Sequence, residues 1–213
     1  MDQLSPQSKS LLADAHRRRI SNELHAVSAI AAANPGRLSL GQLIEGADTV
    51  LGFGLFFDVR TSTVDRLGQL PLEKSLPTHE RVEARFMLDH YPDGAPAIGV
   101  LSQRPLFLPA ARGLPTLVEG RCPALVCTFR GQFSRTIHDL PFFVVQIFRA
   151  LTGDPAVLNA PHDALNPRAA QWFLERRATL ALPFEPELRV PPRLVSATAA
   201  SPCHRTFKLE RLP

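Results

Sequence analysis

Cysteine thiols are the side chains of this chain best suited to covalent chemistry. Cys122 and Cys127 lie five positions apart in the stretch EGRCPALVCTFRGQFSRTIHDLPFFVVQIFRAL, and Cys203 follows in the C-terminal tail. A cysteine thiolate is a strong nucleophile that can hold an acyl group as an activated thioester. Free cysteine is also among the most buried residue types. Each of the first two sulfurs is therefore either a nucleophile or a small core side chain.

His138 and Asp139 are acid–base candidates at the start of the apolar segment that follows these cysteines. An aspartate at a helix N-terminus is stabilised by the helix dipole, which would explain Asp139 without any chemistry. Alternatively, either residue orients or deprotonates an incoming nucleophile. The sequence leaves both roles open.

The cysteine count and the polar N-terminus narrow the class of protein. The chain has 3 cysteines at irregular spacing, which do not make a disulfide framework. No Cys or His cluster has the spacing of zinc ligands, so we expect no metal and no cofactor. The N-terminal residues MDQLSP lack an apolar signal core. No run approaches the roughly 18 apolar residues of a membrane span. We therefore expect a cytoplasmic protein with no membrane partner.

Basic residues are in small excess and mostly scattered. The formal net charge is +4 over 213 residues, and the densest basic run is Arg17, Arg18 and Arg19. An excess of this size does not establish nucleic-acid binding, and we expect no nucleic-acid partner. The arginine run is either a solvated helix face or a contact for a protein partner.

The elements that must position these side chains are helices at both ends of a run of strands. A helix is predicted over residues 6–33, where Ile20, Leu24, Val27 and Ala31 share one face. Strands are predicted over residues 49–61, 80–90 and 97–102 from their near-alternating apolar residues. Residues 37–48 are ambiguous, and a short helix is one interpretation.

The second half of the chain predicts a long ordered loop and then two helices. Residues 103–135 are rich in Pro and Gly but keep apolar anchors, which favours an ordered loop that carries the cysteines. Helices are predicted over residues 136–152 and 166–182, the latter with Asn166 as N-cap. Helices at the ends of an antiparallel meander make the fold class α+β. We place a domain over residues 1–182 and a Pro-rich extension over residues 183–213.

Four segments, taken in order, resemble the ubiquitin-conjugating enzyme family and especially its divergent bacterial branch. Residues 17–27 (RRRISNELHAV) are similar to the first helix of the family. Residues 85–102 (RFMLDHYPDGAPAIGVLS) are similar to its signature of a strand, a Tyr-Pro pair, a further Pro and a second strand. Residues 125–155 (LVCTFRGQFSRTIHDLPFFVVQIFRALTGDP) resemble the segment of the family that holds the catalytic cysteine and the helix after it. LNPRAAQWFLERR (165–177) is similar to the following helix. The resemblance covers roughly residues 12–180 and implies a ubiquitin-conjugating-enzyme-like fold.

This resemblance also implies an activity. An activating enzyme would load the C-terminal glycine of a ubiquitin-like protein onto a cysteine, which would pass it to a protein target. Bacterial relatives often act in anti-phage defence. The distance to Phe133-Ser134 favours Cys127, whereas Cys122 fits the Gly-x-x-Cys pattern of the family only with a one-residue shortening. The arginines at positions 17–19 would contact the activating enzyme, as the first helix of the family does.

The chain departs from the family at two places near the proposed nucleophile. The His-Pro-Asn motif, whose Asn supports the oxyanion, has no copy, and the nearest segment, Leu114-Pro115-Thr116, offers no amide. Phe133 stands where the family has Trp. A second hypothesis is therefore an inert adaptor of the same fold that binds a ubiquitin-like protein or its activating enzyme. A third is an unrelated α+β interaction protein.

Overall fold

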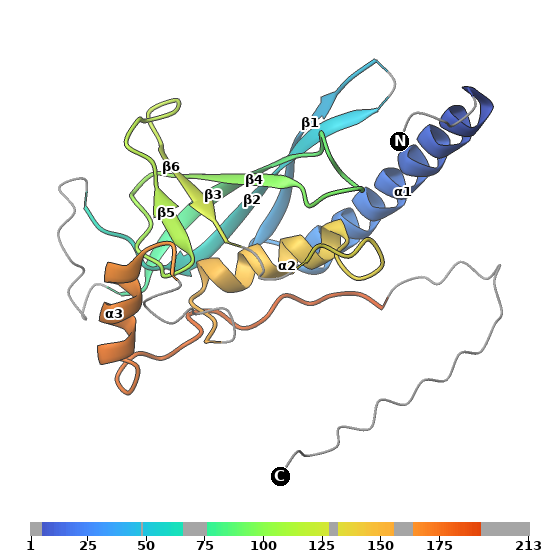
Figure 1. Cartoon of the computed structure of the whole chain (residues 1–213). Coiled ribbons are helices and arrows are strands. Elements are labelled where there is room, and N and C mark those ends of the chain that lie inside the picture. The colour runs from blue at the N-terminus through green and yellow to red at the C-terminus, as the bar shows by residue number, and fades with distance from the viewer. Residues whose placement is uncertain (1–5, 48, 66–75, 128–131, 156–163, 193–213) are drawn as a thin grey trace, which may run out of the picture.

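A computed structural model describes residues 6–47, 49–65, 76–127, 132–155 and 164–192 (Figure 1). Within these residues the predicted α+β class is confirmed, with helices packed on an antiparallel sheet. The helices are α1 (Pro6–Ala33), α2 (Leu140–Leu151) and α3 (Pro167–Glu175). The strands are β1 (Leu38–Glu45), β2 (Val50–Thr61), β3 (Thr78–Met87), β4 (Ala97–Ser102), β5 (Ala111–Gly113) and β6 (Cys122–Val126).

The sheet has the strand order β1-β2-β3-β4-β6-β5, and all neighbouring pairs are antiparallel. The first four strands follow one another as a meander, and the three strands predicted from alternation are β2, β3 and β4. A hairpin of β5 and β6 then extends the sheet, with β6 paired to β4. The strand that ends next to Cys127 is therefore an interior strand of the sheet.

The strands differ from the sequence interpretation at two places. Residues 38–45 form strand β1 and not a short helix. The register shifts between Leu40 and Leu43, which marks an irregularity in the pairing with β2. An extra residue of this kind breaks the period of two, and it left Leu40, Leu43 and Ile44 at helix-like spacing. The predicted loop over residues 103–135 contains strands β5 and β6. Their sequences do not predict strands because they include Gly113 and Pro123, and both residue types are depleted in strands.

The predicted helix limits also need correction. The helix predicted to begin at residue 136 begins at Leu140, because Asp139 is its N-cap. The helix predicted to continue to residue 182 ends at Glu175, where Arg176 is the C-cap and donates its backbone N–H to the Leu174 carbonyl oxygen. Asn166 caps this helix as predicted, since its side chain accepts a hydrogen bond from the Ala169 N–H at 3.1 Å.

Helices α1 and α2 pack on the same face of the sheet, and the core lies between them and the strands (Figure 1). Alternate residues of β2 and β3 point to this face, as the period of two requires. The largest buried contributions come from Phe53, Leu55, Phe57, Val82, Ala84 and Phe86 of the strands and from Phe143, Val144, Ile147 and Leu151 of α2. The predicted apolar stripe of α1 is confirmed by the burial of Ile20, Val27 and Ala31.

Residues 183–192, which we call the strap, run below α2 from α3 toward the end of α1 (Figure 1). Phe184 and Leu188 are buried in the core, with 5% and 8% of their surface exposed. The Asn34 side chain accepts the Arg189 N–H at 2.9 Å and donates to the Arg189 carbonyl oxygen at 2.8 Å. Core residues thus continue beyond residue 182, the predicted end of the domain. Cys203 lies outside the described residues.

A candidate thiol site at one end of the sheet

The two cysteines of the hairpin lie at opposite ends of β6. Cys122 begins the strand opposite Ser102, is 8% exposed, and its thiol contacts the Gln103 carbonyl oxygen at 3.6 Å. Cys127 follows the strand and is half-buried, and its backbone N–H donates to the Ala110 carbonyl oxygen at 2.9 Å. Five residues of an extended strand span about 17 Å, so the two sulfurs occupy separate environments.

Cys127 lies at the end of the sheet where β4 begins. In the register of these antiparallel strands, Gly99 of β4 faces Leu125 of β6. Two more residues along each strand bring Cys127 level with Ala97, the first residue of β4. The turn formed by residues 91–96 leads directly into this position. The structure therefore brings Cys127 and the Tyr-Pro turn to the same end of the sheet.

Aromatic side chains connect this turn to the segment that follows the cysteine. The Phe133 ring packs edge-on against the Tyr91 ring, with the centroids 6.2 Å apart and the planes at 67°. The same Phe133 ring lies 5.8 Å from His138 and 6.4 Å from Phe143. The chain thus returns to the Tyr91 turn before α2 begins, which places His138 and Asp139 at this end of the molecule as well.

His138 and Asp139 make different local contacts. The Asp139 carboxylate accepts the Phe142 N–H at 2.9 Å, so this residue caps α2. His138 Nδ1 accepts the Ser134 N–H at 2.9 Å. An imidazole that accepts at Nδ1 carries its proton on Nε2 in the neutral form. In that tautomer the second nitrogen, Nε2, is a hydrogen-bond donor.

Glu23 of α1 joins the Tyr91 turn to the start of α2, although the sequence did not single it out. Its carboxylate accepts hydrogen bonds from the Tyr91 hydroxyl, from the Leu140 N–H at 2.9 Å and from Arg19 Nε at 2.6 Å. Burial of the phenol and the neighbouring Glu23 carboxylate both disfavour a phenolate and raise the pKa of Tyr91 above its usual range. The one sequence signal was the i,i+4 pair of Arg19 and Glu23, which is common on solvated helix faces.

The arginine run of α1 is divided between the interior and the surface. Arg19 donates to Glu23, and its guanidinium lies 5.4 Å from the centroid of the Tyr91 ring. Arg17 and Arg18 are exposed, and Arg17 forms an ion pair with Asp14. Two of the three predicted partner contacts are therefore on the surface, whereas Arg19 faces into the molecule.

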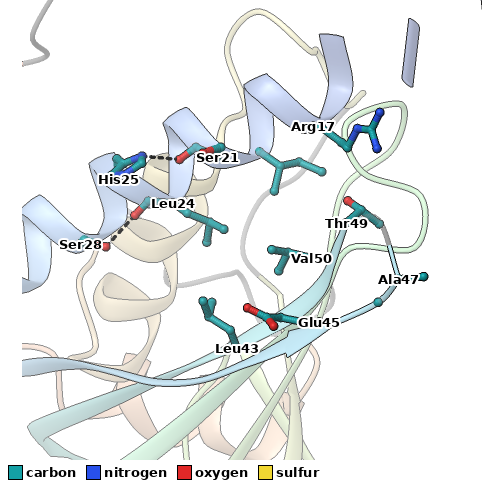
Figure 2. A pocket seen from close by; sticks show the side chains of 12 residues that line it. Arg17, Ser21, Leu24, His25, Ser28, Leu43, Glu45, Ala47, Thr49 and Val50 are labelled. Carbon is teal, nitrogen blue, oxygen red and sulfur yellow. Dashed lines mark hydrogen bonds between the residues drawn. The ribbon is translucent and has the colours of Figure 1, made fainter. Parts of the chain in front are cut away.

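A groove of about 620 Å³ lies between α1 and the β1–β2 hairpin (Figure 2). Its apolar lining comes from Ile20 and Leu24 of α1 and from Leu43 and Val50 of the strands. Arg17 also lines the groove. Neither Tyr91 nor Glu23, Cys127 or His138 lines the groove, so it is separate from the thiol site.

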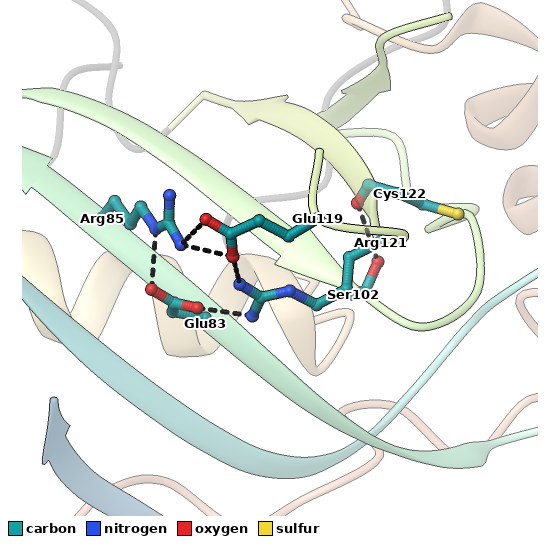
Figure 3. A network of polar contacts seen from close by, with 6 residues as sticks. All are labelled: Glu83, Arg85, Ser102, Glu119, Arg121 and Cys122. Atoms are coloured by element: carbon teal, nitrogen blue, oxygen red, sulfur yellow. Dashed lines mark hydrogen bonds and ion pairs between the residues drawn. The ribbon is translucent and has the colours of Figure 1, made fainter. Parts of the chain in front are cut away.

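The outer face of the sheet carries a network of four charged side chains (Figure 3). Arg85 donates to Glu83 at 2.7 Å and to Glu119 at 3.1 Å, and Arg121 donates to Glu119 at 2.6 Å and also to Glu83. Burial alone would raise the pKa of Glu83, but the hydrogen bonds from Arg85 and Arg121 lower it below its ordinary value. The network holds the β5–β6 turn against β3, and the Cys122 side chain points away from it.

The segment nearest to a family oxyanion motif lies at the wrong end of the hairpin. Leu114 donates its N–H to the Pro123 carbonyl oxygen at 2.9 Å, beyond the pairing of Gly113 with Ala124. Residues 114–116 therefore lie toward the Cys122 end of β6, away from Cys127. Residues 114–116 and Cys127 are therefore at opposite ends of the hairpin.

Comparison with family models, with curated proteins and with solved structures gives no match. None of the helices in the described residues has both the length and the apolar character needed to cross a membrane. The geometry defines an α+β protein with a half-buried thiol, a Tyr-Pro turn and a capped helix start gathered at one end of a sheet.

Proposed function

We propose that this protein is a ubiquitin-conjugating-like transferase that carries a ubiquitin-like protein as a thioester on Cys127. The observation that supports the proposal best is the position of Cys127 after β6, at the end of the sheet shared with the Tyr91 turn. An acyl carrier needs a thiol that both a donor enzyme and an acceptor can reach. Cys122 is a poorer candidate because it is buried within the strand.

The proposed reaction is two acyl transfers. The Cys127 thiolate attacks the thioester carbonyl of a ubiquitin-like protein held by an activating enzyme; a new C–S bond forms and the thiolate of that enzyme leaves. A lysine amine of the target then attacks the Cys127 thioester, an amide C–N bond forms, and the Cys127 thiolate leaves. The proton of the amine passes to a general base or to water.

The site suggests distinct roles for the two residues that precede α2. Asp139 caps the helix and so fixes where it begins. His138 would donate from Nε2 toward the oxyanion of the tetrahedral intermediate, since Nδ1 already accepts the Ser134 N–H. Arg17 and Arg18, on the exposed side of α1, would contact the activating enzyme. The process would be anti-phage defence, as in the bacterial relatives that the sequence resembles, and the site of action the cytoplasm.

An inert adaptor of the same fold is the second candidate, and one observation favours it. Residues 114–116, the segment nearest in sequence to the oxyanion motif, offer no amide and lie at the far end of the hairpin from Cys127. A protein without an oxyanion donor would still bind a ubiquitin-like protein or its activating enzyme through its surface.

A charging assay separates these functions. The protein is incubated with ATP and with the activating enzyme and ubiquitin-like protein encoded beside its gene, and products are separated with and without a reducing thiol. We expect a thiol-sensitive adduct that is lost in Cys127→Ala and kept in Cys122→Ala, the matched control from the same hairpin. The reverse pattern would move the nucleophile to Cys122. Binding without any adduct would identify the adaptor.

A further inference from the structure

The carboxylate of Glu23 joins three segments that are far apart in the sequence. It bonds Arg19 within α1, the Tyr91 hydroxyl in the turn before β4, and the Leu140 N–H at the start of α2. Only 13% of the Glu23 side chain is exposed. We infer that Glu23 is a positioning residue, which holds the start of α2 against α1 and thereby fixes the surroundings of Cys127.

The first turn of α2 depends on Glu23 for one of its backbone partners. The first N–H groups of a helix have no partner within the helix. In α2 the Leu140 N–H donates to Glu23, Pro141 has no N–H, and the Phe142 N–H donates to Asp139. Asp139 is a local cap, but Glu23 comes from another helix. The start of α2 is therefore fixed relative to α1 and not only relative to the residue just before it.

The hydrogen bond from the Tyr91 hydroxyl to Glu23 also ties the turn beside Cys127 to α1. Tyr91 donates to Glu23, and its ring packs against Phe133, which contacts His138. The turn containing Tyr91 leads to Ala97, the residue level with Cys127 in the sheet. Glu23 thus controls both the turn on one side of the thiol and the helix start that follows it.

A second, more exposed contact joins the same elements. Asp93 in the turn lies 3.1 Å from Arg135 and 3.8 Å from His16 of α1. The Asp93 side chain is 64% exposed, and solvated ion pairs contribute little because water screens them. Removal of the Glu23 carboxylate should therefore matter more than removal of the Asp93 carboxylate, because water does not freely replace the hydrogen bonds of a side chain that is mostly buried.

The test uses the full chain and two measurements that need no partner protein. Hydrogen exchange reports the Leu140 N–H, and the rate of Cys127 alkylation by chloroacetamide, followed by mass spectrometry across pH, reports the surroundings of the thiol. The variants are Glu23→Ala and Glu23→Gln. Glu83→Ala is the matched control, because Glu83 is also a bridging carboxylate, 12% exposed, but lies in the network on the outer face of the sheet.

We expect Glu23→Ala to speed exchange of the Leu140 N–H by about tenfold or more, as local opening would. The Cys127 alkylation rate should change by about threefold or more at a given thiolate fraction. Glu23→Gln keeps an oxygen that accepts the Leu140 N–H and should stay within about twofold of wild type in both measurements. Glu83→Ala should leave the Cys127 rate unchanged.

Two results would overturn the inference. One is a folded Glu23→Ala protein whose Cys127 reacts at the wild-type rate. The other is an equal change in Glu83→Ala, which would indicate general loosening. If Glu23→Ala does not fold, Tyr91→Phe decides: it removes one bond to Glu23 and keeps the ring, and an unchanged Cys127 rate counts against the inference. Failure to form a thioester in the charging assay would refute the proposed function and leave this test unaffected.

Discussion

Phe184 provides the most direct test of whether the strap belongs to the folded core. Its ring is 5% exposed and lies 6.2 Å from the Phe173 ring of α3. It also packs against Gly153, where the position of an added Cβ would be 3.3 Å from Phe184 Cε2. The Phe184 N–H donates to the Thr152 carbonyl oxygen at 2.8 Å, so the backbone stays in place when the ring is removed.

We expect Phe184→Ala to lower the free energy of unfolding by about 3 to 4 kcal/mol, because it removes a buried ring and leaves a cavity. The matched control is Val190→Ala in the same strap. Val190 is 52% exposed, so its truncation should change the free energy of unfolding by less than about 0.5 kcal/mol.

Urea unfolding followed by far-UV circular dichroism measures both values. Fluorescence of the single tryptophan, Trp172, is a second probe, since its ring lies 5.4 Å from Phe173. Coincident transitions would support two-state unfolding. A loss below about 1 kcal/mol for Phe184→Ala, or equal losses for the two variants, would refute the conclusion that the strap is part of the core.

Two further predictions concern polar contacts. Glu83→Gln should lower the free energy of unfolding near neutral pH. Because the folded-state pKa of Glu83 lies below its ordinary value, the difference from wild type should shrink as the pH falls through that lowered pKa. Urea titrations at a series of pH values from neutral downward would show it. A difference that grows on acidification would contradict this sign. Asn166→Ala removes the N-cap of α3 and should cost about 1 kcal/mol in the same assay, whereas Gln171→Ala in the exposed part of that helix should cost less. Equal costs would argue against the cap.

The elements with an unbroken period were predictable from the sequence. The long helix α1, the strands β2, β3 and β4, and the apolar face of α2 each show a regular spacing of apolar residues. Strand β1 was missed because its register shift near Leu40 and Leu43 produced a helix-like spacing. Strands β5 and β6 were missed because Gly113 and Pro123 are typical of loops. Local patterns fail where one inserted or unusual residue interrupts the period.

The residues of the site were predictable only where chemistry or local sequence marked them. Cys127, His138 and Asp139 stand out by residue type and by their position before an apolar helix. Glu23 does not, because its bond to Leu140 spans 117 positions of the chain. The strap was equally hidden, since Asn34 and Arg189 are 155 positions apart. The two partners of each contact are too far apart in the sequence for any local pattern to include both.

The hairpin changes where an oxyanion donor would have to come from. The residues just before Cys127 pair with β4 on one side and β5 on the other, so their backbone groups are committed to the sheet. Leu114 and its neighbours are held toward the other end of the hairpin. In the proposed transferase the donor for the acyl oxygen would come from His138, whose Nδ1 accepts the Ser134 N–H and whose Nε2 then carries the proton in the neutral form. In the proposed transferase, an imidazole donor at His138 would thus serve in place of a side-chain amide beside Cys127.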